Sequence, residues 1–456
     1  MQALQQKLYD GITTAQDAAL ACMSPRPLGE TAPRRLRWGL YLLILVTAVV
    51  QTAITPLLPL YEARFGLSSA GSGLLLGLPS LASLAFCLPS GSLADRFGPR
   101  RLTLAAGFAI ALAAVVQAVA PSFLVLLLAR LVFGAGYGVL WTAGLAWFPT
   151  KGSSRGLGAT VVFSGLGCIA GPLFAGLAAQ YVGLALPFLA SAGAIGVVTL
   201  VLFSVGDSTS VTAHRTDWRG ALVDIADEPR AMAALAIVVV AGIVYGMTSL
   251  LAPLELHAGG MSTGEIGAAF AVVSVIYVLA SIGAVSAGRR IVRVPVALFA
   301  ALLAMAGLVL GGLSTAPLVV IALLVASFSG RAVIWTVAYP LGSDGARRAG
   351  IGVGVVLGLV NAVSALVNFL VPLAAGTMAG SVGYRGAFDF AVLGCLAVFG
   401  IFSLHVRTRE QYRVLEGVVG LARRSTTELA VLATRRHAEE RDETELVGDS
   451  ASSPAS

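Results

Sequence analysis

The chain has 456 residues, of which 57% are hydrophobic and 12% are charged, with a mean hydropathy of +0.88. Soluble globular domains carry about 25% charged residues, so the composition excludes that class and indicates a polytopic membrane protein. The formal net charge of +7 could suggest a nucleic-acid partner. However, the basic residues lie in short segments between apolar runs, which is the pattern of membrane orientation. We therefore expect a lipid bilayer as a partner and no nucleic acid.

Within the N-terminal segment 1–38, expected to be cytoplasmic, the opening stretch "MQALQQKLYDGITTAQDAAL" contains no basic part followed by an apolar part, so we expect no cleaved signal peptide. Runs long enough to cross about 30 Å of hydrocarbon follow at residues 39–60, 70–89, 102–120, 123–148, 158–179 and 184–205. After a polar linker at 206–230, six more lie at 231–251, 266–287, 294–313, 317–340, 351–374 and 387–404. The predicted fold is an all-α membrane protein with twelve transmembrane helices in two six-helix pseudo-symmetric halves, residues 39–205 and 231–404.

The basic residues also predict the orientation of the chain. If the N-terminus is cytoplasmic, nearly all arginines between the spans lie inside, and only Arg64 and Arg385 fall in outside loops. This asymmetry predicts a multi-pass cell-membrane protein with both termini in the cytoplasm. In the tail, residues 405–456, Leu415, Val418 and Ala422 share one helical face, which predicts an amphipathic cytoplasmic helix. The alternative is a solvated helix.

The two halves are related in sequence at a constant offset of 194 residues. Gly66 and Ser68 match Gly260 and Ser262, Gly136 matches Gly330, and Trp141-Thr142 matches Trp335-Thr336. Such a parallel repeat is typical of transporters built around a central site.

The segment "GSLADRFGPRRL" (91–102) follows the second span. It places Gly91, Asp95, Arg96, Gly98 and Arg101 in a loop whose arginines favour the cytoplasmic side. This pattern closely resembles the loop signature of the major facilitator superfamily, with Pro99 in place of a usual basic residue.

Further motifs extend this resemblance over about residues 37–404. Arg130, Gly134 and Gly136 resemble the family's fourth-span motif, with Phe133 where Gln is common. In the fifth span, residues resembling the motif associated with antiporters are Gly158, Gly167, Gly171, Pro172, Ala175 and Gly176. "TPLLPLY" (55–61) resembles the first span of the drug:proton antiporter branch. The resemblance implies a secondary transporter that works by alternating access.

Two features suggest gating. Asp95 could meet the positive end of the helix that begins near Gly350 and latch the cytoplasmic side closed; the alternative is a loop that only sets topology. The equivalent loop, residues 283–293, has Arg289 in place of the carboxylate. Gly167, Gly171 and Pro172 would permit close packing and a bend at a moving boundary between the halves.

Arg130 and Arg331 fall within predicted spans, and Arg331 lies nearer the middle of its span. Arg331 could bind an anionic or polar substrate group or repel a proton-loaded site; alternatively, it donates to backbone carbonyls and to Ser327 or Ser329. No Asp or Glu lies in the middle of any predicted span. If protons drive transport, Glu62 and Asp389 are the first carboxylates to test, although both could simply cap or solvate helix ends.

Neutral side chains expected to line a central substrate site are Gln51, Tyr137, Trp141, Tyr245, Thr248, Tyr277, Trp335, Asn361 and Asn368. Asn361 and Asn368 are seven residues apart and therefore share a helical face. For any one of the aromatic residues, core packing is the alternative.

We thus expect a monomeric secondary transporter, with proton-coupled export of small organic or amphipathic compounds. The alternatives are uptake or exchange of organic anions through the intramembrane arginines, lysolipid flipping, and a non-transporting receptor with the same fold. The sequence contains no nucleotide-binding loop, nucleophile–base pair or metal-ligand spacing, so we expect no enzyme, no cofactor and no metal site. The four cysteines are expected to be small buried side chains.

Overall fold

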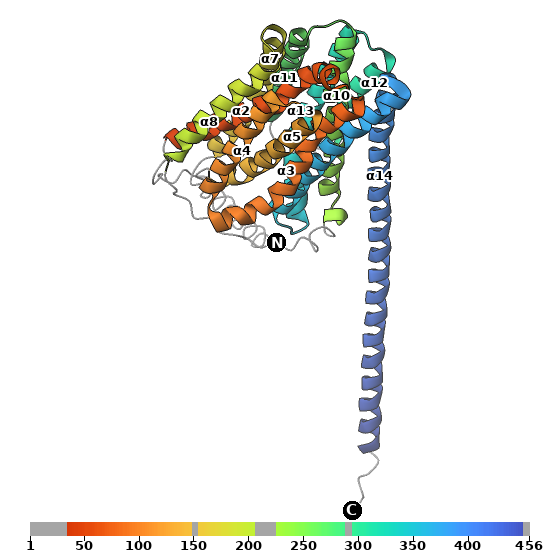
Figure 1. The fold of residues 1–456 in the computed structure, drawn as a ribbon. Helices are drawn as coiled ribbons and strands as arrows, with labels where there is room; N and C mark the ends of the chain where they lie inside the picture. Colours follow the sequence, from red (N-terminus) through yellow and green to blue (C-terminus); the bar gives the residue numbers. More distant parts are fainter. Residues whose placement is uncertain (1–33, 148–153, 206–224, 288–293, 450–456) are drawn as a thin grey trace, which may run out of the picture. The chain divides into compact units, whose positions relative to one another are not determined.

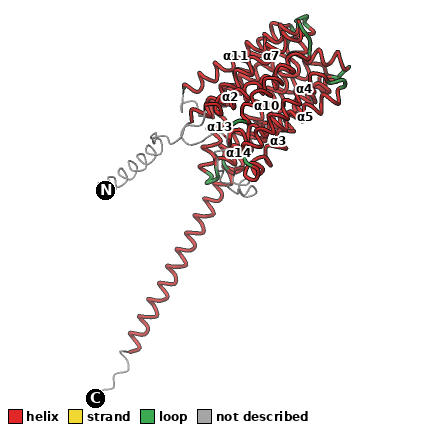
Figure 2. The backbone as a smooth tube through the Cα atoms, turned by 60° about the vertical axis from the view of Figure 1, so that its left-hand side comes forward, coloured by secondary structure: helices red, strands yellow, loops and turns green. Residues whose placement is uncertain are grey.

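A computed structural model describes residues 34–147, 154–205, 225–287 and 294–449 (Figure 1). Only the backbone is described at residues 34, 88, 91, 92, 95, 154–158, 294, 353, 354 and 406–449. Helices joined by short turns make up this part of the chain, and no strand occurs in it (Figure 2). The predicted all-α class is confirmed.

The first set of helices consists of α2 (Arg34–Phe65), α3 (Ser69–Phe97), α4 (Pro99–Val119), α5 (Phe123–Val139), the π-helical segment η1 (Leu140–Gly144), α6 (Leu145–Trp147), α7 (Ser154–Tyr181) and α8 (Ala185–Phe203). The second set consists of α10 (Pro229–Ala258), α11 (Thr263–Ser286), α12 (Val294–Leu313), α13 (Pro317–Arg348) and α14 (Val353–Asp449).

Eleven described segments are long and apolar enough to cross a membrane. The last of them, Val355–His405, has 51 residues, whereas about 20 suffice for one crossing. Gly383 breaks α14 within this segment by adopting a φ of 77°. The segment therefore holds two spans, which gives the twelve expected from the sequence.

The repeat is visible in the way that the helices begin. Gly66 and Gly260 both adopt positive φ angles, 61° and 89°, where α2 and α10 turn toward the next helix. Ser68 and Ser262 then cap α3 and α11 by accepting hydrogen bonds from the backbone N–H of Gly71 and Glu265. Such caps satisfy amides that have no partner within the helix. Residues 194 positions apart thus perform the same structural task.

The same register governs helix packing. A Cβ at Gly136 would lie 2.7 Å from Cγ1 of Ile110 on α4, and a Cβ at Gly330 would lie 2.5 Å from the backbone N of Ala304 on α12. Ile110 and Ala304 are themselves 194 residues apart. This correspondence supports the predicted pseudo-symmetric arrangement of the two sets.

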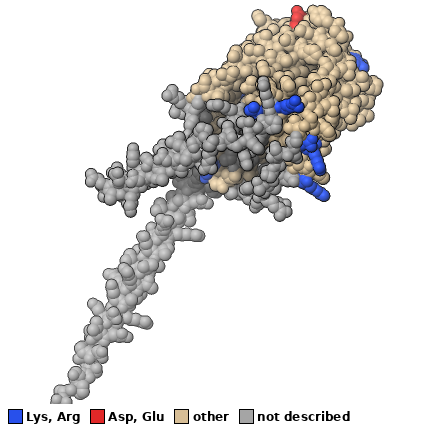
Figure 3. All heavy atoms as spheres, turned by 90° about the vertical axis from the view of Figure 1, so that its left-hand side faces the viewer, with Lys and Arg blue, Asp and Glu red and all other residues tan. Residues whose placement is uncertain are grey.

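Several helices extend beyond their apolar runs. Helix α13 continues past Pro340 to Arg348, where Asp344 pairs with Arg347 at 2.6 Å and with Arg230 at 3.7 Å. We call the end of the bundle with these charges the basic end; the exposed Arg37, Arg96 and Arg101 belong to it. Figure 3 shows most of the basic side chains in the lower half of the tan bundle, one on its upper right edge, and an acidic side chain at the top.

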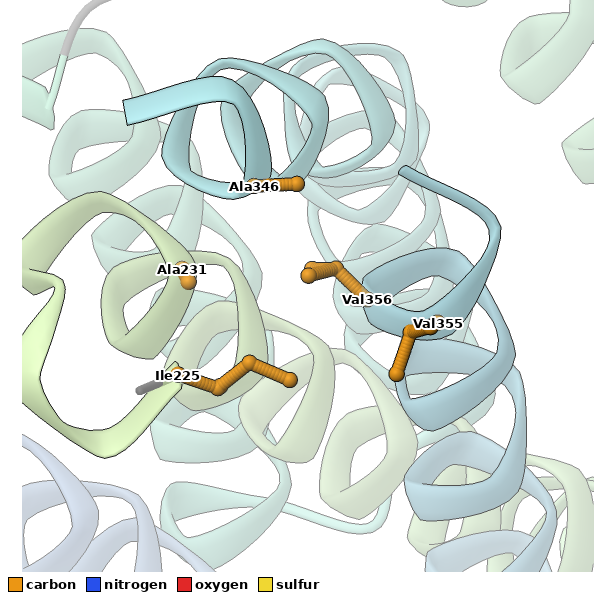
Figure 4. Close-up of a cluster of buried hydrophobic side chains, with 5 residues drawn as sticks. All are labelled: Ile225, Ala231, Ala346, Val355 and Val356. Atoms are coloured by element: carbon orange, nitrogen blue, oxygen red, sulfur yellow. The ribbon is translucent and has the colours of Figure 1, made fainter. Parts of the chain in front are cut away.

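At the basic end, Ile225 and Ala231 before and within α10 pack with Ala346 of α13 and with Val355 and Val356 of α14 (Figure 4). This apolar cluster packs α10 and the segment before it against the end of α13 and the start of α14. From Ala397 onward the chain forms a separate unit, helical to Asp449. Its side chains beyond His405, and with them the predicted amphipathic face, lie outside the described residues.

Candidate functional site

Two helices of the repeat carry matching stripes of aromatic side chains. On α5 and η1, the rings of Phe133, Tyr137 and Trp141 follow one another at four-residue spacing, with centroids 5.9 and 6.1 Å apart. On α13, Trp335 and Tyr339 lie 5.5 Å apart, and Arg331 stands one turn before Trp335. Arg331 occupies the place of Tyr137 in the repeat.

Arg331 lies against two tyrosines of neighbouring helices. Its guanidinium carbon is 4.3 Å from the ring centroid of Tyr245 on α10 and 5.6 Å from that of Tyr277 on α11. Cation–π contacts of this kind contribute about 0.5–2 kcal/mol each, and insertion of an arginine at the centre of a span costs at least about 2.5–3.5 kcal/mol. The two rings therefore offset only part of the cost of this charge.

The guanidinium has no counter-charge among the described residues, where its Nε atom is buried without a hydrogen-bond partner. The two serines proposed as its partners bond elsewhere. Ser327 donates to the carbonyl of Ala304 at 3.2 Å and Ser329 to that of Val325 at 2.7 Å. Neither bond involves Arg331, so the donor role of Arg331 toward these serines stays a prediction.

Side chains of the first set approach the same place. Cys168 of α7 lies within electrostatic range of Arg331, and Tyr137 of α5 lies within range of Tyr245 and Tyr339. We name this group of side chains the central cluster. Its members are Tyr137, Cys168, Tyr245, Tyr277, Arg331 and Tyr339. Five helices from both sets contribute to it, and none of its members is acidic.

Other predicted lining residues border this cluster or lie elsewhere. Trp141 and Trp335 adjoin it through Tyr137 and Tyr339, and Asn361 of α14 accepts a hydrogen bond of 2.8 Å from the Tyr339 hydroxyl. Asn368, in contrast, faces Gly242 of α10 and donates to Ser364 at 3.4 Å. Gln51 is half-buried on α2, and its side-chain oxygen has no partner in the described part of the chain.

Arg130 is the more enclosed of the two intramembrane arginines. Its side chain is 0% exposed, and Nε donates to the Leu75 carbonyl of α3 at 3.4 Å. The guanidinium lies 5.2 Å from the Phe133 ring, and Tyr61 is within electrostatic range. Both Nη atoms are buried without partners among the described residues. Arg331 lies nearer the middle of its span, but Arg130 is more deeply enclosed by protein.

Two seams join the first set to the second toward the end opposite the basic one. In the first seam, Gly73 of α3 faces the Pro372 carbonyl of α14, and Gly376 faces that of Ser69. In the second, Gly267 of α11 faces the Pro172 carbonyl of α7, and a Cβ at Gly176 would lie 2.5 Å from the Thr263 oxygen. In both seams backbone meets backbone, because glycine has no side chain to intervene.

The seams reveal a second repeat that the 194-residue offset conceals. "PLFAG" at 172–176 of α7 recurs as "PLAAG" at 372–376 of α14, 200 residues later. Two other glycines of α7, expected from the sequence at a boundary between the halves, contact a helix of their own set instead. Gly167 and Gly171 pack on α2, at Ala48 and Thr52, within the first set.

In the second set the small and large residues exchange places. Val367 and Val371 of α14 occupy the positions of Gly167 and Gly171, and they pack against Gly242 and Gly246 of α10. The close approach is thus preserved although the glycines lie on the other helix. This exchange explains why the second set lacks a full copy of the glycine motif.

The carboxylates lie near the end opposite the basic one. Glu62 accepts a hydrogen bond of 2.7 Å from Ser72, while Glu255 is only 6% exposed and lies near Thr315. Tyr384 of α14 is within electrostatic range of both acids and lies near Ser69 of the first seam. Asp389, in contrast, is exposed beside Gly312 of α12.

The predicted latch at the basic end is only partly visible. Gly98 adopts a φ of 86° between α3 and α4, and Gly350 one of 71° before α14. Arg96 and Arg101 are exposed. Only the backbone is described at Gly91 and Asp95, and residues 288–293, which include Arg289, lie outside the described part of the chain. The latch therefore stays a prediction.

Sequence reasoning did not single out Cys168, Tyr339 or Glu255. Tyr339 could have been found, because it lies eight residues after Arg331 and therefore on the same helical face. Cys168 had no such signal, since a lone cysteine in an apolar helix is most often a packing residue.

Comparison with known proteins agrees with this architecture. The family model described as Major Facilitator Superfamily matches residues 40–357. The chain is 33% identical over 164 residues to an uncharacterized MFS-type transporter, YuxJ, of Bacillus subtilis (strain 168), which covers 34% of this chain and 42% of the relative. It is 29% identical over 219 residues to the multidrug resistance protein Stp of Mycobacterium tuberculosis (strain CDC 1551 / Oshkosh), covering 46% and 39%. The chain thus matches less than half the length of these relatives.

Solved structures share the fold. A bacterial homologue of the human lysosomal transporter Spinster, in an inward-facing and unoccupied conformation, has a TM-score of 0.69 at 17% identity, covering 84% of this chain and 99% of that one. A variant of the nucleoside transporter NupG has a TM-score of 0.66 at 10% identity, covering 81% and 99%. With a family model that matches most of its length and twelve spans in two related sets, the chain belongs to the major facilitator superfamily.

Proposed function

We propose that this transporter exports small organic or amphipathic compounds across the cell membrane in exchange for protons, with both termini in the cytoplasm. The observation that carries the proposal is the central cluster, to which helices of both sets contribute. A site shared by two pseudo-symmetric sets changes its access when one set rocks against the other. The multidrug resistance protein among the relatives supports export.

The seams support the alternation of access. With both seams closed, the end opposite the basic one is sealed by backbone contacts. If the basic end is cytoplasmic, this is the inward-facing state. Opening the other side requires the pairs α3–α14 and α7–α11 to separate, and glycine surfaces part without rearranging interlocked side chains.

Proton coupling requires a group that gains and loses a proton, which an arginine does not do. Glu62 and Glu255 are the best-placed groups, because they lie near the end sealed by the seams and flank Tyr384 of the facing helix. Asp389 is a weaker candidate because its side chain is exposed. We assign the proton-carrying role to Glu62 and Glu255.

The test is transport of a panel of drugs by purified protein in proteoliposomes with an imposed pH gradient. We expect the gradient to drive accumulation, and Glu62→Gln and Glu255→Gln to abolish that response while substrate counterflow continues. The matched control is Glu265→Gln, since Glu265 is an exposed capping residue of α11. Transport that ignores the gradient would contradict proton coupling, and the absence of counterflow for every compound would contradict transport itself.

A further inference from the structure

The central cluster contains a positive charge and no negative one. Every acidic side chain that the structure describes lies near a helix end or in a connecting segment; these are Glu62, Asp227, Glu228, Glu255, Glu265, Asp344 and Asp389. Arg331 forms no ion pair with any described residue, and its Nε atom is buried without a hydrogen-bond partner among them. Arginine does not relieve this by losing its proton.

From this geometry we propose that the central cluster binds the anionic group of a substrate that has a planar apolar body. The guanidinium of Arg331 between the rings of Tyr245 and Tyr277 would hold a carboxylate, sulfonate or phosphate. This inference rests on the proposed transport function, and it names the class of compound that the same site takes.

The arrangement suits an anion in two ways. Arg331 lies over the Tyr245 ring at 4.3 Å, and a guanidinium stacked on a ring keeps the N–H groups along its edge free for a bidentate oxyanion. Tyr137 adds a phenolic group nearby, and such a hydroxyl donates to anionic oxygens, whereas the Tyr339 hydroxyl already donates to Asn361.

The surroundings suit an apolar body and oppose a cation. Trp141 and Trp335 adjoin Tyr137 and Tyr339 of the cluster, one from each set, so large aromatic side chains border it on helices of both sets. Cationic compounds would meet the Arg331 charge without any carboxylate to balance it in the described part of the cluster. Organic cations should therefore be poor substrates, although cations and anions of equal size would fit equally well by shape.

The experiment compares fluorescein, an anion, with a rhodamine methyl ester, here called rhodamine, which has the same tricyclic body and a net positive charge. Binding to purified protein in nanodiscs of neutral lipid is measured by fluorescence anisotropy at neutral pH. We expect the wild type to bind fluorescein about tenfold or more tightly than rhodamine, because an ion pair formed out of water discriminates by charge. Arg331→Gln should remove the preference, and Arg331→Lys should keep it with weaker binding.

Matched controls separate the site from general effects. Arg64→Gln should behave as wild type, because Arg64 is occupied by the Ala120 carbonyl at the end opposite the basic one. Should Arg331→Gln fail to fold, Tyr245→Leu should weaken fluorescein binding while Tyr245→Phe preserves it. Competition by lysophosphatidylglycerol but not by lysophosphatidylcholine would identify a lipid as the source of the anion, and competition by naphthalene sulfonate a soluble aromatic compound.

The proposal is overturned if the wild type binds rhodamine as tightly as fluorescein, if it binds neither dye nor either lysolipid, or if Arg331→Gln leaves the ratio unchanged. Counterflow of neutral or cationic compounds in those cases would leave the transport function standing. Conversely, a strong preference for fluorescein in a protein that moves no compound would contradict the transport function and not the anion site.

Discussion

The two intramembrane arginines illustrate how differently the same residue can be placed. Arg130 is completely enclosed and contacts the Leu75 carbonyl and the Phe133 ring of its own set. Arg331 lies over tyrosines of two other helices, and its charge is within electrostatic range of Cys168 of the opposite set. Position along a helix does not distinguish the two arginines, because the enclosure of a side chain depends on which neighbours its helix face meets.

Arg130→Met is expected to raise the melting temperature and to impair transport. A buried charge without an acidic partner is costly, and replacing buried charges with apolar groups of similar volume stabilises proteins by about 1–4 kcal/mol. Thermal unfolding in detergent and counterflow in proteoliposomes measure the two effects. Arg64→Met serves as the control and should not raise the melting temperature, because Arg64 lies at a helix end. A clear loss of stability in Arg130→Met would mean that the Leu75 contact stabilises the fold.

At the scale of the element, the glycine seams make each pair of helices sensitive to one added side chain. A Cβ at Gly376 would overlap the Ser69 carbonyl, whereas one turn later a Cβ at Gly380 would meet nothing within 4 Å. Both glycines lie on α14, so they form a matched pair for substitution. Only the first substitution should affect the closed seam.

Gly376→Val is therefore expected to shift the protein toward the state in which the first seam is open, and Gly380→Val is expected to leave it unchanged. Spin labels at Ala63→Cys and Ser381→Cys, both exposed near the seam, report the change as a longer distance. The labels belong in a background without the native cysteines. Equal distance distributions in the two valine variants would show that this contact does not hold the seam closed.

The spans were predictable because a membrane crossing leaves a long apolar run in the sequence. Their ends were not, because helices such as α3 and α13 continue for two turns with polar residues once the backbone hydrogen bonds are established. The π-helical turn at Leu140–Gly144 was also not predicted, since the equivalent Trp335-Thr336 lies in a regular α-helix. Neither the helix extensions nor the π-helical turn produces a hydrophobic pattern in the sequence.

On the scale of the whole molecule, the site was predicted in part. Arg331, Tyr137 and Tyr245 were identifiable because polar or aromatic residues in apolar spans are conspicuous. Their meeting with Cys168 was not predictable, because it depends on how helices of the two sets face each other. Asn368 shows the converse: it shares a helical face with Asn361, but it packs toward α10.

The orientation of the molecule is open to a direct test. A green fluorescent protein fused to the C-terminus should fluoresce, and alkaline phosphatase inserted at residues 259–262 should be active, because arginines concentrate on the cytoplasmic side. Phosphatase inserted in the 206–224 connector should be inactive. The reverse pattern would place both termini outside the cytoplasm.

The uncompensated Arg331 also has an electrical consequence. Voltage acts on charge that moves across a membrane with about 2.3 kcal/mol per elementary charge per 100 mV. A substrate with one negative charge would cancel the guanidinium, so the loaded site would be neutral while the empty site remains positive. Substrate-for-substrate exchange, in which the site is occupied in both directions, should then be insensitive to membrane potential. Net transport requires the empty carrier to return and should respond to it.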